Sequence, residues 1–147
     1  MSIAVRYATL PDSERLARLV TMLGYAVSPT QMHTRLEEIL ADDDYVTLVA
    51  CDHNEVVGFI GTRVGPLYES DGLYGQIMAL AIANDRQRRG TGRALIEAAE
   101  SELASRGARV VLVTSGHQRA DAHAFYERNG YTFTGRRYTK AIGSPPD

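Results

Sequence analysis

The sequence contains no tryptophan, one cysteine and no apolar run of the length that crosses a membrane. A single cysteine excludes a disulfide within the chain, so Cys51 is expected to be a small buried core residue in a reducing cytoplasm. A membrane-spanning helix needs about 18 or more consecutive apolar residues, and the N-terminal segment lacks the basic-then-apolar layout of a signal peptide. We therefore expect a cytoplasmic protein with no membrane partner.

The chain also lacks a surplus of basic residues, metal-ligand spacings, repeats and linkers. Its 16 Lys and Arg against 18 Asp and Glu give a formal net charge of −2, which argues against general nucleic-acid binding. No Cys/His spacing indicates a metal site. The 147 residues, 44% hydrophobic and 23% charged, are typical of one globular domain with a sizeable core. We expect a single domain over residues 1–147, with a loose tail at 143–147.

Hydrophobic periodicity and turn signals predict alternating strands and helices. Two capping signals, at 9–12 and 28–31, each indicate the start of a helix. The further expected helices span 94–106 and 118–129, and the expected strands span 3–7, 45–51, 56–64, 73–83, 108–114 and, as one strand or two, 131–140. This order, β-α-α-β-β-β-α-β-α-β, predicts an α/β fold with one mixed sheet, helices on both of its faces and a parallel, right-handed crossover over 73–114. Gly58 and Gly61 inside a strand indicate a bulge or a close backbone approach.

A glycine turn joins the apolar strand that ends at Ala83 to the helix that starts near Ala94. Gly90 and Gly92 allow a tight turn with its N–H groups pointing inward, and the first helical turn adds unpaired donors and a partial positive charge. Four arginines surround this turn: Arg86, Arg88, Arg89 and Arg93. On an acidic chain such a local concentration of positive charge predicts an anionic ligand.

The glycine turn completes neither of two common nucleotide motifs. No G-x-x-x-x-G-K-[ST] run exists, and Leu95 follows the turn without the third small residue of a Rossmann fingerprint. The run Gln87-x-x-Gly90-x-Gly92, preceded by Leu-Ala-Ile at 80–82, resembles the GNAT superfamily of N-acetyltransferases. The predicted order of elements also matches that family over essentially the whole chain.

The resemblance implies that the turn cradles the pyrophosphate of acetyl-CoA through backbone N–H groups, while the strand before it serves the pantetheine and the acetyl oxygen. Any strand–glycine–helix connection would share part of this pattern. The residues that the resemblance assigns to the coenzyme are Ile82, Ala83, Gln87, Arg88, Arg89, Gly90, Thr91, Gly92, Arg93 and, from a later segment, Arg119. Many family members carry an asparagine at this position. Arg119 could instead contact the phosphates or the adenine of the coenzyme.

A second motif, residues 124–131 (Ala-Phe-Tyr-Glu-Arg-Asn-Gly-Tyr), resembles a family segment whose tyrosine lies near the coenzyme sulfur. A phenol keeps its proton at neutral pH and can donate it to a departing thiolate, so Tyr126 is the candidate general acid. The alternative is that Tyr126 is an amphipathic core residue. No general base is assigned, because the strand before the turn has no carboxylate in 74–80, and Glu69 and Asp71 upstream are interpreted as solvated loop acids.

These observations predict an N-acetyltransferase that moves an acetyl group from acetyl-CoA to the primary amine of a small molecule, by direct attack in a ternary complex. Cys51 lies in an earlier strand and is not placed for a covalent intermediate. Acetylation of a protein amine, a non-catalytic acyl-CoA-binding module and a nucleotide-binding α/β domain are the alternatives. The resemblance also allows a homodimer.

Overall fold

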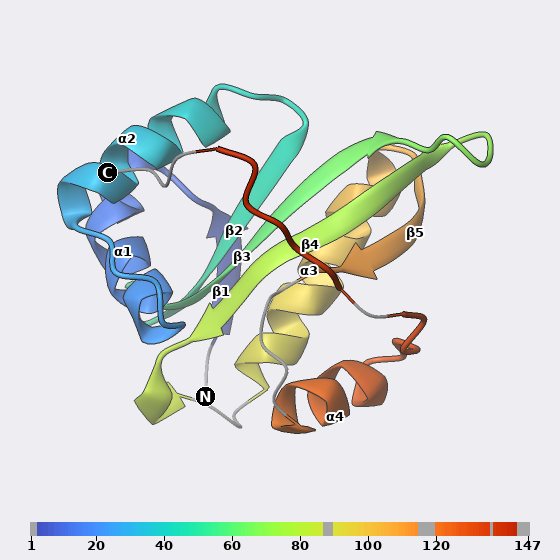
Figure 1. Cartoon of the computed structure of the whole chain (residues 1–147). Coiled ribbons are helices and arrows are strands. Elements are labelled where there is room, and N and C mark those ends of the chain that lie inside the picture. The colour runs from blue at the N-terminus through green and yellow to red at the C-terminus, as the bar shows by residue number, and fades with distance from the viewer. Residues whose placement is uncertain (1–2, 87–89, 115–119, 136, 144–147) are drawn as a thin grey trace. The chain divides into compact units, whose positions relative to one another are not determined.

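The computed structural model describes residues 3–86, 90–114, 120–135 and 137–143 (Figure 1). The chain divides into two compact units, residues 1–115 and 116–147, and each is described by itself. The prediction of a single domain over the whole chain stays a prediction. Gln87, Arg88, Arg89 and Arg119 lie outside the described residues, as does most of the predicted loose tail.

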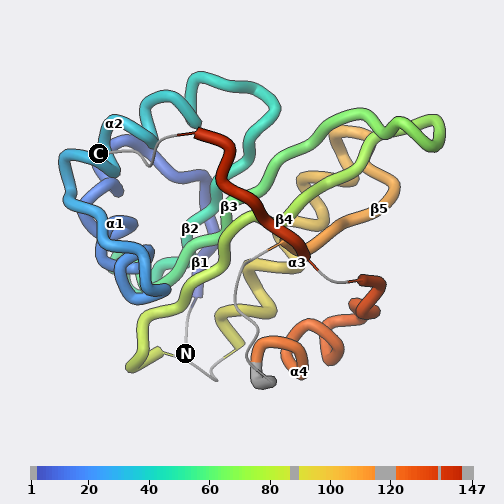
Figure 2. Tube along the Cα trace, viewed as in Figure 1, coloured from blue at the N-terminus to red at the C-terminus, as the bar shows by residue number. Residues whose placement is uncertain are grey.

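The first unit is built on one five-stranded sheet with the order β1-β2-β3-β4-β5. The strands are β1 (Ile3–Tyr7), β2 (Tyr45–Asp52), β3 (Glu55–Pro66), β4 (Leu73–Ile82) and β5 (Ala108–Val113). Neighbouring strands are antiparallel except β4 and β5, which are parallel. The trace in Figure 2 shows that the sheet follows the order of the chain, and the mixed sheet predicted from the sequence is confirmed.

Helices cover both faces of this sheet. The short 3-10 turn η1 (Leu10–Asp12), α1 (Ser13–Met22) and α2 (Pro29–Leu40) form one core with the sheet, in which Leu16 and Leu36 join Phe59 and Ala81. The other face carries α3 (Thr91–Ser105), which buries Leu95, Ile96, Ala99 and Leu103 and contacts β2, β3 and β4 (Figure 1). The parallel pairing of β4 with β5 on either side of α3 confirms the parallel crossover predicted from the sequence.

Both predicted capping signals start a helical segment. Ser28 Oγ accepts from the Gln31 N–H at 3.1 Å, and the Gln31 side chain accepts from the Ser28 N–H at 2.9 Å. At the first signal the Asp12 carboxylate accepts the Thr9 N–H at 2.8 Å. The same carboxylate, in a residue only 7% exposed, receives a bidentate pair from Arg6 at 2.9 and 3.0 Å. One acidic side chain therefore ties β1 to the start of α1.

Replacing Asp12 by asparagine should lower the free energy of unfolding by about 2 kcal/mol at pH 7, because Arg6 would lose a buried charged partner. Burial acts to raise the pKa of Asp12, but the hydrogen bonds from Arg6 and Thr9 outweigh it and hold that pKa below its usual value of 3.8. The stabilisation that the ionised Asp12 carboxylate gives to the fold is thus complete above about pH 4 and is lost as the pH falls below that value. Urea unfolding of the wild type and Asp12→Asn at pH 7 and pH 3 measures this stabilisation. An equal difference in the free energy of unfolding at the two pH values would contradict the prediction.

The second unit holds α4 (Ala120–Arg128), which ends before Gly130 with its φ of 91° as the sequence predicts. The last predicted strand, within 131–140, is not formed in the described residues. The aromatic residues of this segment pack back on α4 instead: the Tyr131 ring lies 6.0 Å from Tyr126, and the Phe133 ring lies 6.0 Å from His123. The Tyr131 N–H also donates to the Tyr126 carbonyl at 3.0 Å, which binds this turn to the helix.

Candidate functional site

Strand β4 continues past the end of its pairing with β5. The last paired residues are Ile77 and Val113, and the Thr114 N–H donates to the Ile77 carbonyl at 3.0 Å, while β4 runs on to Ile82. The Ala83 N–H donates to the Val57 carbonyl on β3 at 2.8 Å. Because N–H directions alternate along a strand, the Ile82 N–H is directed away from β3, toward the side where the β5 pairing has ended.

A bulge lies at the point where β4 and β5 part. Gly61 of β3 opposes Ala79, but Thr62 opposes Ile77, so Met78 has no counterpart on β3. A bulge bends its strand and increases the local twist, which separates β4 from the line of β5. Gly58 allows the close approach on the other side, since a Cβ there would lie 3.1 Å from the Ala81 carbonyl oxygen. The irregularity predicted from Gly58 and Gly61 is confirmed.

The glycine turn leads into α3, which begins at Thr91, three residues before the start at Ala94 expected from the sequence, so Gly92 lies in the first helical turn. After the 3-10 turn η2 (Asn84–Arg86), Gly90 adopts a left-handed φ of 80° and stands at the N-cap of α3. The first N–H groups of a helix have no partner within it and attract an anion. Thr91 is 1% exposed, and its Oγ1 is buried with no hydrogen-bond partner among the described residues. These features fit a phosphate group at the start of α3.

Two of the four arginines around the turn face carboxylates of the protein. Arg86 lies 3.5 Å from Glu55 and 3.8 Å from Asp52, both at the turn between β2 and β3. Glu55 also pairs with Arg15 of α1. Arg93 pairs with Glu97 at 2.8 Å on the exposed side of α3, and that hydrogen bond raises the pKa of the guanidinium. Arg86 therefore holds η2 against the turn between β2 and β3, and its guanidinium faces these carboxylates instead of an anionic ligand.

The backbone of Ala83 is engaged on both sides. Its N–H donates to the Val57 carbonyl of β3, and its carbonyl accepts the Arg86 N–H at 2.8 Å, so the coenzyme contact expected of Ala83 stays a prediction. The other predicted contacts at Ile82, Thr91, Gly92 and Arg93 lie on the end of β4 and the first turn of α3. Their contact with a coenzyme stays a prediction.

Tyr126 lies on α4 in the second unit, half-buried, with its ring 5.4 Å from Phe125 and in edge contact with Tyr131. These contacts fix the ring within its unit. They agree with the core interpretation of Tyr126 as well as with the catalytic one, so its role as the general acid stays a prediction.

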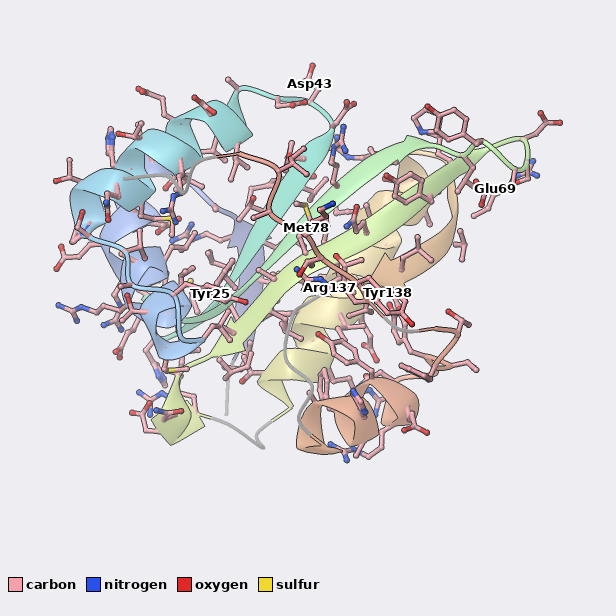
Figure 3. All side chains as sticks on the ribbon, in the orientation of Figure 1. Tyr25, Asp43, Glu69, Met78, Arg137 and Tyr138 are labelled. Carbon is pink, nitrogen blue, oxygen red and sulfur yellow. The ribbon has the colours of Figure 1, made fainter. Side chains whose placement is uncertain are left out.

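The upstream acids are far from the end of β4. Glu69 and Asp71 are exposed at the tip of the β3–β4 hairpin, where Figure 3 shows Glu69. The length of β4 from Leu73 to Ile82 separates that tip from the glycine turn by roughly 30 Å, at about 3.3 Å per residue. Neither acid can reach a group held beside Ile82, which agrees with their interpretation as solvated loop residues.

The described residues contain no cluster of three or more His, Cys, Asp and Glu that could hold a metal ion. In the same part of the chain, no helix has the length and apolar character needed to span a membrane.

Comparison with known proteins places this arrangement in a family. The model of the acetyltransferase (GNAT) family matches residues 13–131. The chain is 27% identical over 139 residues to an aminoalkylphosphonate N-acetyltransferase of Salmonella typhimurium, covering 94% of this chain and 90% of that protein. A GNAT family acetyltransferase of Staphylococcus aureus superposes with a TM-score of 0.82 at 27% identity, covering 97% and 100% of the two chains. An aminoglycoside N-acetyltransferase in complex with CoA superposes with a TM-score of 0.84 at 16% identity, covering 95% and 94%.

The chain belongs to the acetyltransferase (GNAT) family, and it is an enzyme that transfers an acetyl group. The family resemblance seen in the sequence is thereby confirmed.

Replacing Arg86 by glutamine should raise the KM for acetyl-CoA about threefold and leave kcat almost unchanged. The substitution releases η2 from Asp52 and Glu55 and loosens the turn, but both ion pairs are long and partly screened by water, so the effect is small. Steady-state kinetics measures it. Arg18→Gln is the matched control, since Arg18 is exposed and its one carboxylate partner in the described part of the chain is Glu14 on its own helix. A large loss of kcat in the Arg86 variant would contradict a positioning role.

Proposed function

We propose that the protein transfers the acetyl group of acetyl-CoA to the primary amine of a small molecule by direct attack in a ternary complex. The observation that carries this proposal is the start of α3, where Gly90 in a left-handed conformation presents the first N–H groups of the helix. These donors suit the pyrophosphate of coenzyme A, and the backbone of β4 beyond Ile77 suits the amides of its pantetheine arm.

In this reaction the neutral amine nitrogen attacks the thioester carbonyl carbon. A C–N bond forms, the carbonyl oxygen carries negative charge in the tetrahedral intermediate, and the C–S bond then breaks. The backbone N–H of Ile82 is our candidate donor to that oxygen, because a preorganised amide stabilises developing charge. Tyr126 is our candidate acid for the leaving thiolate, and the proton lost by the amine passes to water, since no carboxylate is assigned as base.

Direct attack is supported by the position of Cys51. This cysteine is 7% exposed on β2 and packs in the core with Phe59 and Ala81, among residues of α1 and α2. A covalent acyl-enzyme would need an accessible thiol with a base beside it, and Cys51 has neither the exposure nor a hydrogen-bonding partner of that kind in the described chain.

We infer from the relatives that the acceptor is a small molecule. The names of the Salmonella relative and of the aminoglycoside enzyme describe small-molecule amines as their substrates. Coenzyme A release, followed with a thiol reagent, tests the proposal across a panel of 2-aminoethylphosphonate, an aminoglycoside, a simple alkylamine and an alanine-terminated peptide. Amine-dependent release with a small acceptor is expected. Release with the peptide alone would move the function to protein acetylation, and release with none would refute this proposal.

A further inference from the structure

The two parallel strands of the first unit separate at a fork, formed by Ile77 of β4 and Thr114, the residue that follows β5. β5 lies beside only the first part of β4, from Leu73 to Ile77, and β4 continues to Ile82 (Figure 1). The Thr114 N–H donates to the Ile77 carbonyl at 3.0 Å, and among the described residues this bond is the last rung between the strands. Its position decides where the backbone of β4 leaves its neighbour.

A side-chain hydrogen bond closes the fork beside that rung. The Gln76 amide nitrogen donates to Thr114 Oγ1 at 2.8 Å, and both residues are half-buried. Gln76 pairs with Leu112, and Thr114 follows two residues later, so the two side chains lie on the same face of the sheet. Thr114 Oγ1 also lies 3.5 Å from the Ile77 carbonyl oxygen. Two consecutive residues of β4 therefore hold Thr114, through its backbone and through its hydroxyl.

This double attachment stabilises a rung that would otherwise open easily. The terminal rungs of a sheet fray, because they have a supporting rung on one side alone. A hydrogen bond that is partly shielded from water shifts such an equilibrium about fivefold toward the closed form. Gln76 is also the one amide side chain of β4, whose other residues are apolar, aromatic or glycine. The residue type needed for this bond therefore occurs where the strands separate.

The fork determines which backbone groups of β4 a coenzyme can reach. The Ala83 N–H is directed to β3, so alternation directs the backbone groups of Leu80 and Ile82 to the opposite side. From Ile77 to Ile82 the strand spans roughly 17 Å at about 3.3 Å per residue, which suits an extended arm with two amides. If the rung at Ile77 opened, the unpaired stretch would lengthen and the arm could bind in more than one register.

We propose that Gln76 is a positioning residue, which holds Thr114 at the fork and thereby fixes the register of the pantetheine arm of coenzyme A along β4. This inference rests on the proposed function. Gln76 acts through Thr114 and the backbone and contacts neither the thioester nor the acceptor, since Ile82 lies roughly 20 Å further along the strand. The bond should therefore support binding of the arm and leave binding of the diphosphate at the start of α3 unaffected.

The test separates the two halves of the coenzyme. Gln76→Met removes the amide and keeps the length of the side chain. It should raise the KM for acetyl-CoA about fivefold, while kcat stays within about twofold, because the lost interaction supports binding and not the chemical step. ADP carries a diphosphate without the arm, and its inhibition constant against acetyl-CoA should also stay within about twofold. Gly90→Val, in contrast, should weaken the binding of both.

Variants of Thr114 test the bond itself. Thr114→Val removes the hydroxyl at nearly constant shape and should raise the KM for acetyl-CoA as much as Gln76→Met does. Thr114→Ser keeps the hydroxyl and should restore the wild-type value. The double variant should show no further loss, since both substitutions remove the same bond. Ser13→Ala is the matched control, because Ser13 loses a hydroxyl bond of 2.6 Å to the Leu10 carbonyl outside the fork and should keep its KM.

Three results would overturn the inference. They are a wild-type KM for acetyl-CoA in Gln76→Met, equal losses for acetyl-CoA and ADP, or additive losses in the double variant. If no amine releases thiol, the proposed function fails by itself, and calorimetric titration then decides on the inference. Weaker binding of coenzyme A with unchanged binding of ADP in Gln76→Met supports it, and unchanged or absent binding of coenzyme A ends it.

Discussion

Replacing Tyr126 by phenylalanine is expected to lower kcat about a hundredfold while the affinity for acetyl-CoA changes little. Proton transfer by a positioned side chain contributes roughly 10²- to 10⁴-fold to a rate, and the substitution removes only the hydroxyl that would protonate the leaving thiolate. The ring contacts with Phe125 and Tyr131 remain possible for phenylalanine, so the fold of α4 should be preserved. Single-turnover kinetics together with a coenzyme titration separate the two quantities.

Tyr131→Phe provides the control for this experiment. It makes the same chemical change on a neighbouring ring, 6.0 Å from Tyr126, and should leave kcat within about twofold of the wild type. An unchanged kcat in Tyr126→Phe would remove this tyrosine from the mechanism and support its interpretation as a packed residue. Equal losses in both variants would indicate a structural effect of the hydroxyl groups.

Gly90→Val should raise the KM for acetyl-CoA roughly 30-fold. The φ of 80° at Gly90 is left-handed, and a β-branched residue there costs about 2 kcal/mol or shifts the backbone. A Cβ at this position would meet no atom of the described residues within 4 Å, so the expected effect comes from the backbone conformation. A shifted turn would redirect the first N–H groups of α3 away from the phosphates.

Gly24→Val is the matched control, because Gly24 also has a positive φ, 104°, and no atom of the described residues lies within 4 Å of its Cβ position. Both variants should lose similar stability in urea unfolding, and only the Gly90 variant should lose coenzyme affinity. Calorimetric titration with coenzyme A measures that affinity directly. Equal affinity in the two variants would show that the turn does not bind the coenzyme.

Most of the fold could be predicted from the sequence because the signals for its helices and strands are local. The capping residue Ser28 and the left-handed Gly90 act through their own neighbours; Ser28 caps α2 as predicted, and Gly90 caps α3 three residues earlier than the helix start expected near Ala94. The strand expected within 131–140, which the described residues do not form, depended on a long-range partner that hydrophobic periodicity does not specify. The rings of Tyr131 and Phe133 pack against Tyr126 and His123 of α4 instead.

The arginines show why a site is harder to predict than a fold. Arg86 belongs to a run that attracts attention as an anion site, but Asp52 and Glu55, far away in the sequence, engage it.

The parallel pairing of β4 with β5 also has a kinetic consequence. β2, β3 and β4 are joined by short turns and can assemble as a local meander, whereas β5 can pair only after α3 has crossed the sheet. The junction between β4 and α3 is therefore completed late in folding. We expect coenzyme A, which would bind at that junction, to slow unfolding more than it accelerates refolding, because contacts absent from the folding transition state act on the unfolding rate.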